Sequence, residues 1–208
     1  MIELYHCNDA RSFRALWALE EMELPYKLHL LPFPPRVHRP DYLELNPLGT
    51  IPLLVDGDVR LTESSAITQY LATRYGPTPL ALDPSEPDYG RWLDWLHRSE
   101  ATLTFPLTIV LRYSRLEAEE NRDPRIAGDY TRWFLSRLRH LSRELEGRKW
   151  LCGERFTMAD VCVGYALLFA GDLDLAGKFS EPVQRYWERL SARPAFARAK
   201  AAQACVHP

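Results

Sequence analysis

The stretch NPLGTIPLLVDGDVRLTESSAI, which runs from Asn46 to Ile67, decides the fold. Within it, IPLLV and VRLT flank Asp56-Gly57, a pair that favours a tight turn between antiparallel strands. From Ser64 onward, apolar residues recur at the spacing of one helix face, namely at Ile67, Tyr70, Leu71 and Tyr75. The stretch therefore predicts two antiparallel strands followed by a helix.

The residues before this stretch predict a strand, a helix, a second strand and a short helix. IELYH is strand-like and is followed by a helix from Ser12 to Met22. YKLHLL alternates apolar and polar residues from Tyr26 with the period of a strand. The short helix RPDYLEL ends at Asn46, because Pro47 restricts the residue before it. The βαβ part should have a right-handed crossover and a parallel strand pair.

The residues after the stretch change character at GPTPLALDPSEPD, a proline-rich segment typical of a linker. Beyond it every strong pattern is helical, and VCVGYALLFAG is apolar on all sides, as expected of a helix buried in a bundle. Thr157 and Asp160 precede that helix in a capping arrangement. We therefore predict an α/β domain over 1–77, a linker over 78–87 and an all-helical domain over 88–208.

Composition excludes several classes of function. The 208 residues carry a formal net charge of -2, which gives no general attraction to nucleic acid or anionic lipid. The longest uncharged apolar run, Val161 to Gly171, is far shorter than the roughly 20 residues that span a bilayer. The four cysteines have no metal-ligand spacing and are expected to be free thiols in a reducing compartment. We expect a soluble, cytoplasmic protein that contacts neither nucleic acid nor membrane and binds no metal.

Three segments in this order resemble the cytosolic glutathione transferases, in particular the bacterial and fungal general group. They are ARSFRALWALEE, the Asn46–Ile67 stretch and WLCGERFTMADV. The resemblance implies an α/β plus all-α fold, with an N-terminal thioredoxin-like βαβ–ββα domain followed by a C-terminal helical bundle. It also implies glutathione as co-substrate, a small-molecule electrophile as second substrate and a homodimer.

The resemblance places the glutathione site on four short segments. An Ile51-Pro52 bond in the cis form would turn the backbone of Ile51 outward, where the cysteinyl part of an extended peptide can dock. An ordinary trans proline at a strand start is the alternative. Glu63 and Ser64 would bind the γ-glutamyl end, although the same residues could be a plain helix cap. Other expected contacts are Thr50 and, for the glycyl carboxylate, His38 and Arg39, which could also be a solvated basic loop.

The group that ionises the thiol is less clear, because the usual residues are missing. Chemistry on glutathione needs a thiolate, and a free thiol of pKa about 8.5 is mostly protonated at neutral pH. The family's serine and cysteine positions fall here on Ala10 and Asp9. Arg11, through its charge, and Ser12, through its hydroxyl and the helix start, are our catalytic candidates. Ser12 could equally be the helix N-cap, and Arg11 a surface ion-pair partner.

Three further residues near this loop have alternative roles. Asn8 could donate through its amide or only form the turn, and Tyr5 more plausibly packs inside the domain. Cys7 could form a mixed disulfide with glutathione, as reductase-like members of the family do. It stands two residues before the family's cysteine position, and a buried structural cysteine is the better interpretation.

The resemblance implies an electrophile pocket built from the first loop and the long helices of the second domain. Its candidate lining residues are Phe105, Pro106, Ile109, Arg112 and Tyr113. An apolar wall of this kind favours lipophilic electrophiles, with Arg112 admitting some negative charge. Pro106 predicts a kink in a long helix. The residues could instead belong to the core or to a dimer surface, where Tyr89, Trp92 or Trp95 could also lie. The predicted function is glutathione conjugation, with a glutathione-dependent peroxidase or disulfide reductase and a non-catalytic binding module as alternatives.

Overall fold

The computed structural model describes residues 1–204, which form two compact units. The first unit combines the residues up to Ala81 with those from Ser191 onward, and the second spans Leu82–Leu190. Our domain boundaries of 1–77, 78–87 and 88–208 stay predictions. The contacts nevertheless group the residues from Ser191 with the first unit, because the last helix packs on the first one.

The first unit is a four-stranded mixed sheet with helices, as the sequence predicts. The sheet has the order β2-β1-β3-β4; β1 pairs with β2 in parallel and with β3 antiparallel, and β3 pairs with β4 antiparallel. The elements are β1 (Ile2–His6), α1 (Phe13–Glu21), β2 (Tyr26–Leu30), α2 (Pro35–His38), α3 (Tyr42–Leu45), β3 (Leu53–Asp56), β4 (Val59–Leu61), α4 (Ser64–Arg74) and α10 (Pro194–Ala204).

Local sequence explains most of these elements. The β3–β4 turn places Gly57 at φ +60°, a left-handed conformation that favours glycine. The helix α2 was not predicted, because its surroundings are rich in proline. It begins with Pro35, whose fixed φ and missing N–H are tolerated at a first helical position.

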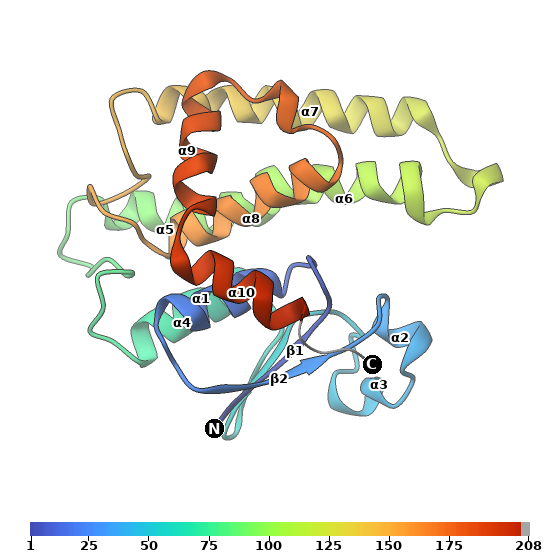
Figure 1. Cartoon of the computed structure of the whole chain (residues 1–208), viewed down its shortest axis with the longest axis horizontal. Helices are drawn as coiled ribbons and strands as arrows, with labels where there is room; N and C mark the ends of the chain where they lie inside the picture. Colours follow the sequence, from blue (N-terminus) through green and yellow to red (C-terminus); the bar gives the residue numbers. More distant parts are fainter. Residues whose placement is uncertain (205–208) are drawn as a thin grey trace. The chain divides into compact units, whose positions relative to one another are not determined.

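The C-terminal helix α10 packs on α1, and Figure 1 shows both beside α4 on the same side of the sheet. Phe196 of α10 meets Phe13 and Trp17 of α1 in edge-on ring contacts, with centroids 5.5 Å and 5.0 Å away. Arg193 also donates from Nε and Nη2 to the carboxylate of Glu21, at 2.6 Å and 2.7 Å. The chain end is therefore attached to the helix that follows the candidate thiolate loop.

The second unit is helical, as predicted. Its elements are α5 (Tyr89–Arg98), η1 (Ser99–Thr104), α6 (Phe105–Leu111), η2 (Arg112–Leu116), η3 (Glu119–Asn121), α7 (Pro124–Glu144), α8 (Met158–Asp172), η4 (Ala176–Lys178) and α9 (Glu181–Ser191). The predicted long helix carrying Trp92 and Leu103 is divided by the π-helical turns of η1, which directly precede α6 and Pro106. Figure 1 shows α6 and α7 running side by side.

The core of the second unit is α8, whose residues from Met158 to Ala170 are all buried. The capping prediction is confirmed, since the carboxylate of Asp160 accepts from the Thr157 N–H at 2.8 Å. It also accepts from the Tyr186 hydroxyl at 2.8 Å and the Leu151 N–H at 3.1 Å. One buried carboxylate thus joins three separate segments.

The suggestion that Trp92 or Trp95 lies at a dimer surface is wrong. Trp92 is 0% exposed and Trp95 is 3% exposed within the single chain, so neither ring is available to a partner. Their spacing on α5 indicates an apolar face, and α8 fills the space against that face. Tyr89, which precedes them, is half-buried.

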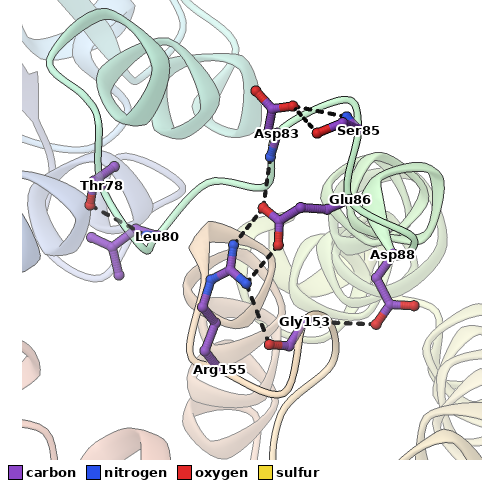
Figure 2. Close-up of polar contacts among 8 residues, drawn as sticks. All are labelled: Thr78, Leu80, Asp83, Ser85, Glu86, Asp88, Gly153 and Arg155. Carbon is purple, nitrogen blue, oxygen red and sulfur yellow. Dashed lines mark hydrogen bonds and ion pairs between the residues drawn. The ribbon is translucent and has the colours of Figure 1, made fainter.

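The segment that opens the second unit is fastened to the loop before α8 (Figure 2). Glu86 accepts from Nη1 and Nη2 of Arg155 at 2.8 Å and 2.7 Å, and Asp88 accepts from the Gly153 N–H at 2.9 Å. Across the described residues 1–204, no helix is both long and apolar enough to cross a membrane. No cluster of three or more potential metal-binding side chains occurs in the same range.

Candidate active site

The loop between β1 and α1 is a compact turn held by its own backbone. The Ala10 N–H donates to the Cys7 carbonyl at 3.2 Å, and the Phe13 N–H donates to the Ala10 carbonyl at 2.8 Å. Asp9 has φ +50°, in the left-handed region that residues with a Cβ rarely adopt. Asn8 at its start is exposed, whereas Arg11 near its end is half-buried.

The hydroxyl of Ser12 lies inside this loop. Ser12 is 0% exposed; its Oγ accepts from the Cys7 N–H at 3.3 Å and donates to the Cys7 carbonyl at 3.4 Å. Ser12 occupies the N-cap position of α1, as the alternative has it, but its side chain makes no capping hydrogen bond. In this structure the hydroxyl shapes the loop from which Arg11 projects.

Cys7 is buried and its thiol is held in the neutral form. Burial raises the pKa of Cys7 to about 12, and the thiol donates to the Pro32 carbonyl at 3.6 Å. The thiolate that disulfide exchange requires is therefore absent at neutral pH. The buried-cysteine interpretation is confirmed, and the mixed-disulfide alternative is not favoured.

The segment before β3 is held by two side chains that the sequence analysis did not single out. The carbonyl of Thr50 accepts from the Tyr42 hydroxyl at 2.8 Å and from Nδ2 of Asn46 at 2.9 Å. The Ile51–Pro52 peptide bond is cis, so the trans alternative is wrong. Ile51 precedes β3 and lies outside its pairing register with β1, which leaves the residue at the edge of the ladder. In the sequence, Asn46-Pro47 marks the end of a short helix but gives no sign of these bonds.

The start of α4 is linked directly to α1. Ser64 is the first residue of α4, is 3% exposed, and accepts from Nη1 of Arg14 at 2.9 Å. Glu63 occupies the cap position, but its side chain forms no capping hydrogen bond and is exposed. Glu63 therefore holds the cap position without a side-chain cap, and Ser64 lies inside the helix rather than at its cap. Arg14 is fully buried, which is rare for an arginine unless it has a partner.

The predicted segments meet around one small apolar cluster. Cys7, Leu31, Tyr42 and Leu53 form it, and both Ala10 and Ile51 pack against it. Together with the Arg14–Ser64 hydrogen bond, this packing connects the β1–α1 loop (residues 7–12), which is our candidate thiolate loop, with the segment before β3 and the start of α4.

A hollow of about 590 Å³ lies beside the loop; its lining residues are Cys7, Asn8, Leu30, Leu31, Pro32, Phe33 and Arg39. His38, the last residue of α2, is exposed and does not line this hollow. Its neighbour Arg39 is engaged with Asp41, donating from Nε at 3.1 Å and from Nη2 at 2.7 Å.

The predicted electrophile residues lie in the second unit. Phe105 is the first residue of α6 and is 50% exposed, while Tyr113 lies in η2 and is half-buried. Pro106 is buried. Arg112 donates from Nε to Oε1 of Glu117 at 2.6 Å, so its positive charge is already paired.

The family models for the N-terminal and C-terminal domains of glutathione S-transferase match residues 10–74 and 135–194. Two curated relatives are each 30% identical to the chain. They are glutathione S-transferase 3 of Schizosaccharomyces pombe, which covers 94% of the chain and 85% of its own length, and GstB of Escherichia coli, which covers 94% and 95%. The chain belongs to the glutathione S-transferase family. Its activity is glutathione transfer, with glutathione as the co-substrate, and neither alternative function is favoured.

A solved glutathione transferase structure has the same fold as this chain. The transferase URE2P6 from Phanerochaete chrysosporium, in complex with oxidized glutathione, is 25% identical and has a TM-score of 0.85. The match covers 98% of this transferase and 96% of URE2P6. The thioredoxin-like α/β fold followed by a helical bundle is thereby confirmed.

Proposed function

We propose that this transferase binds glutathione across the thiolate loop, residues 50–52 and the start of α4, and delivers its thiolate to a small hydrophobic electrophile. The observation that carries the proposal is the connection of these three segments through the Arg14–Ser64 hydrogen bond and the shared packing of Ala10 and Ile51. A tripeptide that contacts all three segments would meet groups of fixed relative position. Such fixed groups favour binding, because the protein loses little conformational entropy when the ligand associates.

The γ-glutamyl end of glutathione belongs at the start of α4 in this proposal. Its carboxylate would accept from the Ser64 hydroxyl and from the unpaired N–H groups of the first turn, where the helix dipole favours negative charge. Arg14, which lies on α1, donates to the Ser64 hydroxyl and adds a buried positive charge. Glu63 is exposed beside it and would accept from the ammonium group.

The cysteinyl part docks on Ile51, with Thr50 and Pro52 fixing that backbone. Ile51 precedes the paired residues of β3, so an extended peptide can add to it as a short strand. The hydrogen bonds from Tyr42 and Asn46 to the Thr50 carbonyl hold the segment rigid. For the glycyl carboxylate, His38 is the proposed contact; it is exposed, and Arg39 is already paired with Asp41.

The thiolate is stabilised chiefly by Arg11, with Ser12 as the second catalytic candidate. A guanidinium carries a permanent charge and donates in a fixed geometry, which lowers the pKa of a nearby thiol. Ser12 would have to break its hydrogen bonds with Cys7 before it could donate to the sulfur. The negative charge of Asp9, which would oppose a thiolate, is balanced by Lys200 at 2.7 Å.

The second substrate is apolar in this proposal. Phe105 exposes half of an aromatic ring, and Tyr113 of the neighbouring η2 adds a second ring with a polar tip. Because Arg112 is paired with Glu117, it offers little charge to an anionic electrophile. Conjugation rates should therefore rise with the hydrophobicity of the electrophile.

We propose further that the enzyme is a cytoplasmic homodimer, because dimers are usual in this family. With Trp92 and Trp95 buried, any interface must use other residues. Sedimentation equilibrium should give twice the chain mass of 24.1 kDa. A single-chain mass at micromolar concentration would overturn the dimer.

An ultraviolet difference titration of bound glutathione tests the proposed thiolate site. The bound thiol should show a pKa at least about one unit below its free value, equivalent to about 1.4 kcal/mol. Arg11→Ala should raise that pKa toward the free value, whereas Ser12→Ala should change it less. An unshifted pKa in the wild type would refute thiolate activation at this loop. A larger effect of Ser12→Ala than of Arg11→Ala would exchange their roles.

A further inference from the structure

Asp9 is held by the C-terminal helix α10 through a two-point contact with Gln203. The Asp9 N–H donates to Oε1 of Gln203 at 3.2 Å, and Nε2 of Gln203 donates to Oδ1 of Asp9 at 2.7 Å. Lys200, one turn earlier in α10, donates from Nζ to both carboxylate oxygens of Asp9, at 2.7 Å and 2.9 Å. Gln203 itself is 4% exposed, whereas the side chains of Lys200 and Asp9 are 36% and 33% exposed.

The Gln203 amide satisfies Asp9 and His6 together in one orientation. Its Nε2 lies 3.0 Å from Oε1 of Gln203, and the ring is fully buried. Burial lowers the pKa of His6 to about 4, so the ring is neutral at physiological pH. Because Oε1 of Gln203 can only accept, the tautomer that satisfies this contact carries its proton on Nε2. The amide therefore has only one satisfied orientation, with its oxygen toward two N–H donors and its nitrogen toward a carboxylate.

The contact supports a backbone conformation that would otherwise be unfavourable. Asp9 has φ +50°, where a Cβ approaches the following carbonyl oxygen. Its neighbours in the chain are Asn8 and Ala10, and Arg11 follows directly. Holding both the N–H and the side chain of Asp9 therefore sets the direction in which Asn8 and Arg11 leave the turn.

The attachment of α10 does not depend on Asp9. Arg193 is paired with Glu21, Arg198 donates from Nε to Glu20 at 2.9 Å, and Phe196 packs on α1. Gln203 and Lys200 thus add a contact to the loop that the helix does not need for its own placement. Sequence position gives no hint of it, because 194 residues separate Asp9 from Gln203.

We propose that Gln203 and Lys200 are positioning residues for the loop that binds the glutathione thiolate, a role that rests on the proposed function of that loop. They act through Asp9: Gln203 fixes the turn, and Lys200 neutralises the carboxylate that this turn carries. Neither residue needs to touch glutathione. Misplacing a catalytic group by about 1 Å costs up to roughly 100-fold in rate, so the effect on activity should be large.

Three variants of α10 separate positioning from simple anchoring. Gln203→Ala removes both hydrogen bonds between Gln203 and Asp9. Lys200→Met removes the positive charge but keeps the aliphatic part of the side chain. Arg198→Ala removes a contact between α10 and α1 that does not involve Asp9. For Gln203→Ala we expect kcat/KM to fall roughly 10-fold or more and the bound-thiol pKa to rise by at least about 0.5 unit. Lys200→Met should also lower kcat/KM and raise the bound-thiol pKa, but by less. Arg198→Ala should keep kcat/KM within about twofold of the wild type and leave the bound-thiol pKa unchanged.

S-Methylglutathione, which lacks an ionisable thiol, is the binding probe in the same series. Its Kd should change less than about twofold in Gln203→Ala, because the start of α4 and Ile51 are intact. A Gln203→Ala enzyme with wild-type thiol pKa, or one that loses S-methylglutathione affinity and activity in parallel, would overturn the positioning role. If Gln203→Ala does not fold, Lys200→Met decides by the same two measurements. A wild-type thiol pKa equal to that of free glutathione would instead refute the proposed thiolate site, and the positioning role with it.

Discussion

Arg14 donates from Nη1 to the hydroxyl oxygen of Ser64 at 2.9 Å, although 50 residues separate them in the chain. Both side chains are buried, so the bond is shielded from competing water. It connects the helix that follows the thiolate loop with the helix start proposed to bind the γ-glutamyl carboxylate. The bond therefore fixes the first turn of α4 relative to α1.

Removing the Ser64 hydroxyl should weaken glutathione binding without unfolding the protein. Ser64→Ala deletes a hydrogen bond to a charged partner, for which about 1.5–3 kcal/mol is usual, so Kd should rise roughly 10- to 100-fold. Isothermal titration calorimetry with glutathione measures this directly. Ser65→Ala, on the next position of α4, is the matched control and should bind as the wild type does. Equal affinities for the Ser64→Ala and wild-type proteins would contradict the proposed γ-glutamyl site.

Cys7 should be dispensable for catalysis despite its closeness to the loop. Burial raises its pKa to about 12, so it is a neutral thiol throughout the working range of the enzyme. Cys7→Ala should keep kcat/KM within about twofold and lower the unfolding free energy by about 1 kcal/mol through lost packing. Steady-state conjugation assays and urea denaturation supply the two numbers. Loss of activity with unchanged stability would restore Cys7 to the mechanism.

The fold was predictable from sequence because its signals are local. The Asp56-Gly57 turn, the alternation in β2 and the apolar length of α8 each specify an element without reference to distant residues. The π-helical turns of η1 were not predictable in this way. They depend on how the segment packs against α8. The Thr104 hydroxyl donates to the Ser99 carbonyl at 2.7 Å, but in the sequence Thr104 cannot be told from an ordinary helix residue.

The candidate site was predictable only where motifs carry it. Ile51-Pro52 and Glu63-Ser64 were proposed from the sequence because they lie together in one stretch, and the structure adds the cis Ile51–Pro52 bond and the place of Ser64 at the start of α4. Arg14 and Gln203 were missed, because each acts through a contact with a residue far away in the chain. A buried arginine on an apolar helix is a weak sequence signal, and a glutamine in the last turn of a helix is none at all.

Asp160 should be a major determinant of the stability of the second unit. Asp160→Ala would leave the Leu151 N–H, the Thr157 N–H and the Tyr186 hydroxyl without their buried acceptor. Unsatisfied buried donors cost about 1–3 kcal/mol each, so we expect a loss of more than about 3 kcal/mol in unfolding free energy. Urea denaturation followed by circular dichroism measures it. Asp160→Asn, which keeps one acceptor oxygen, should lower the unfolding free energy by less. An Asp160→Ala protein as stable as the wild type would contradict the role of this network.

The Glu86–Arg155 pair in Figure 2 should make stability depend on acid pH. The Arg155 guanidinium, helped by the Asp83 N–H, lowers the pKa of Glu86 to about 2 from the ordinary 4.5. Because the folded pKa is the lower one, the contribution is complete above pH 4.5 and is lost as the pH falls toward about 2. Glu86→Gln should therefore lower the melting temperature by roughly 1–3 °C at neutral pH. Its difference from the wild type in melting temperature should vanish in acid.

Calorimetric scans from neutral pH to about pH 2 provide the measurement, with Glu154→Gln as a nearby exposed control. A Glu86→Gln difference that is constant with pH would mean that the pair holds the two segments by shape and neutral hydrogen bonding alone.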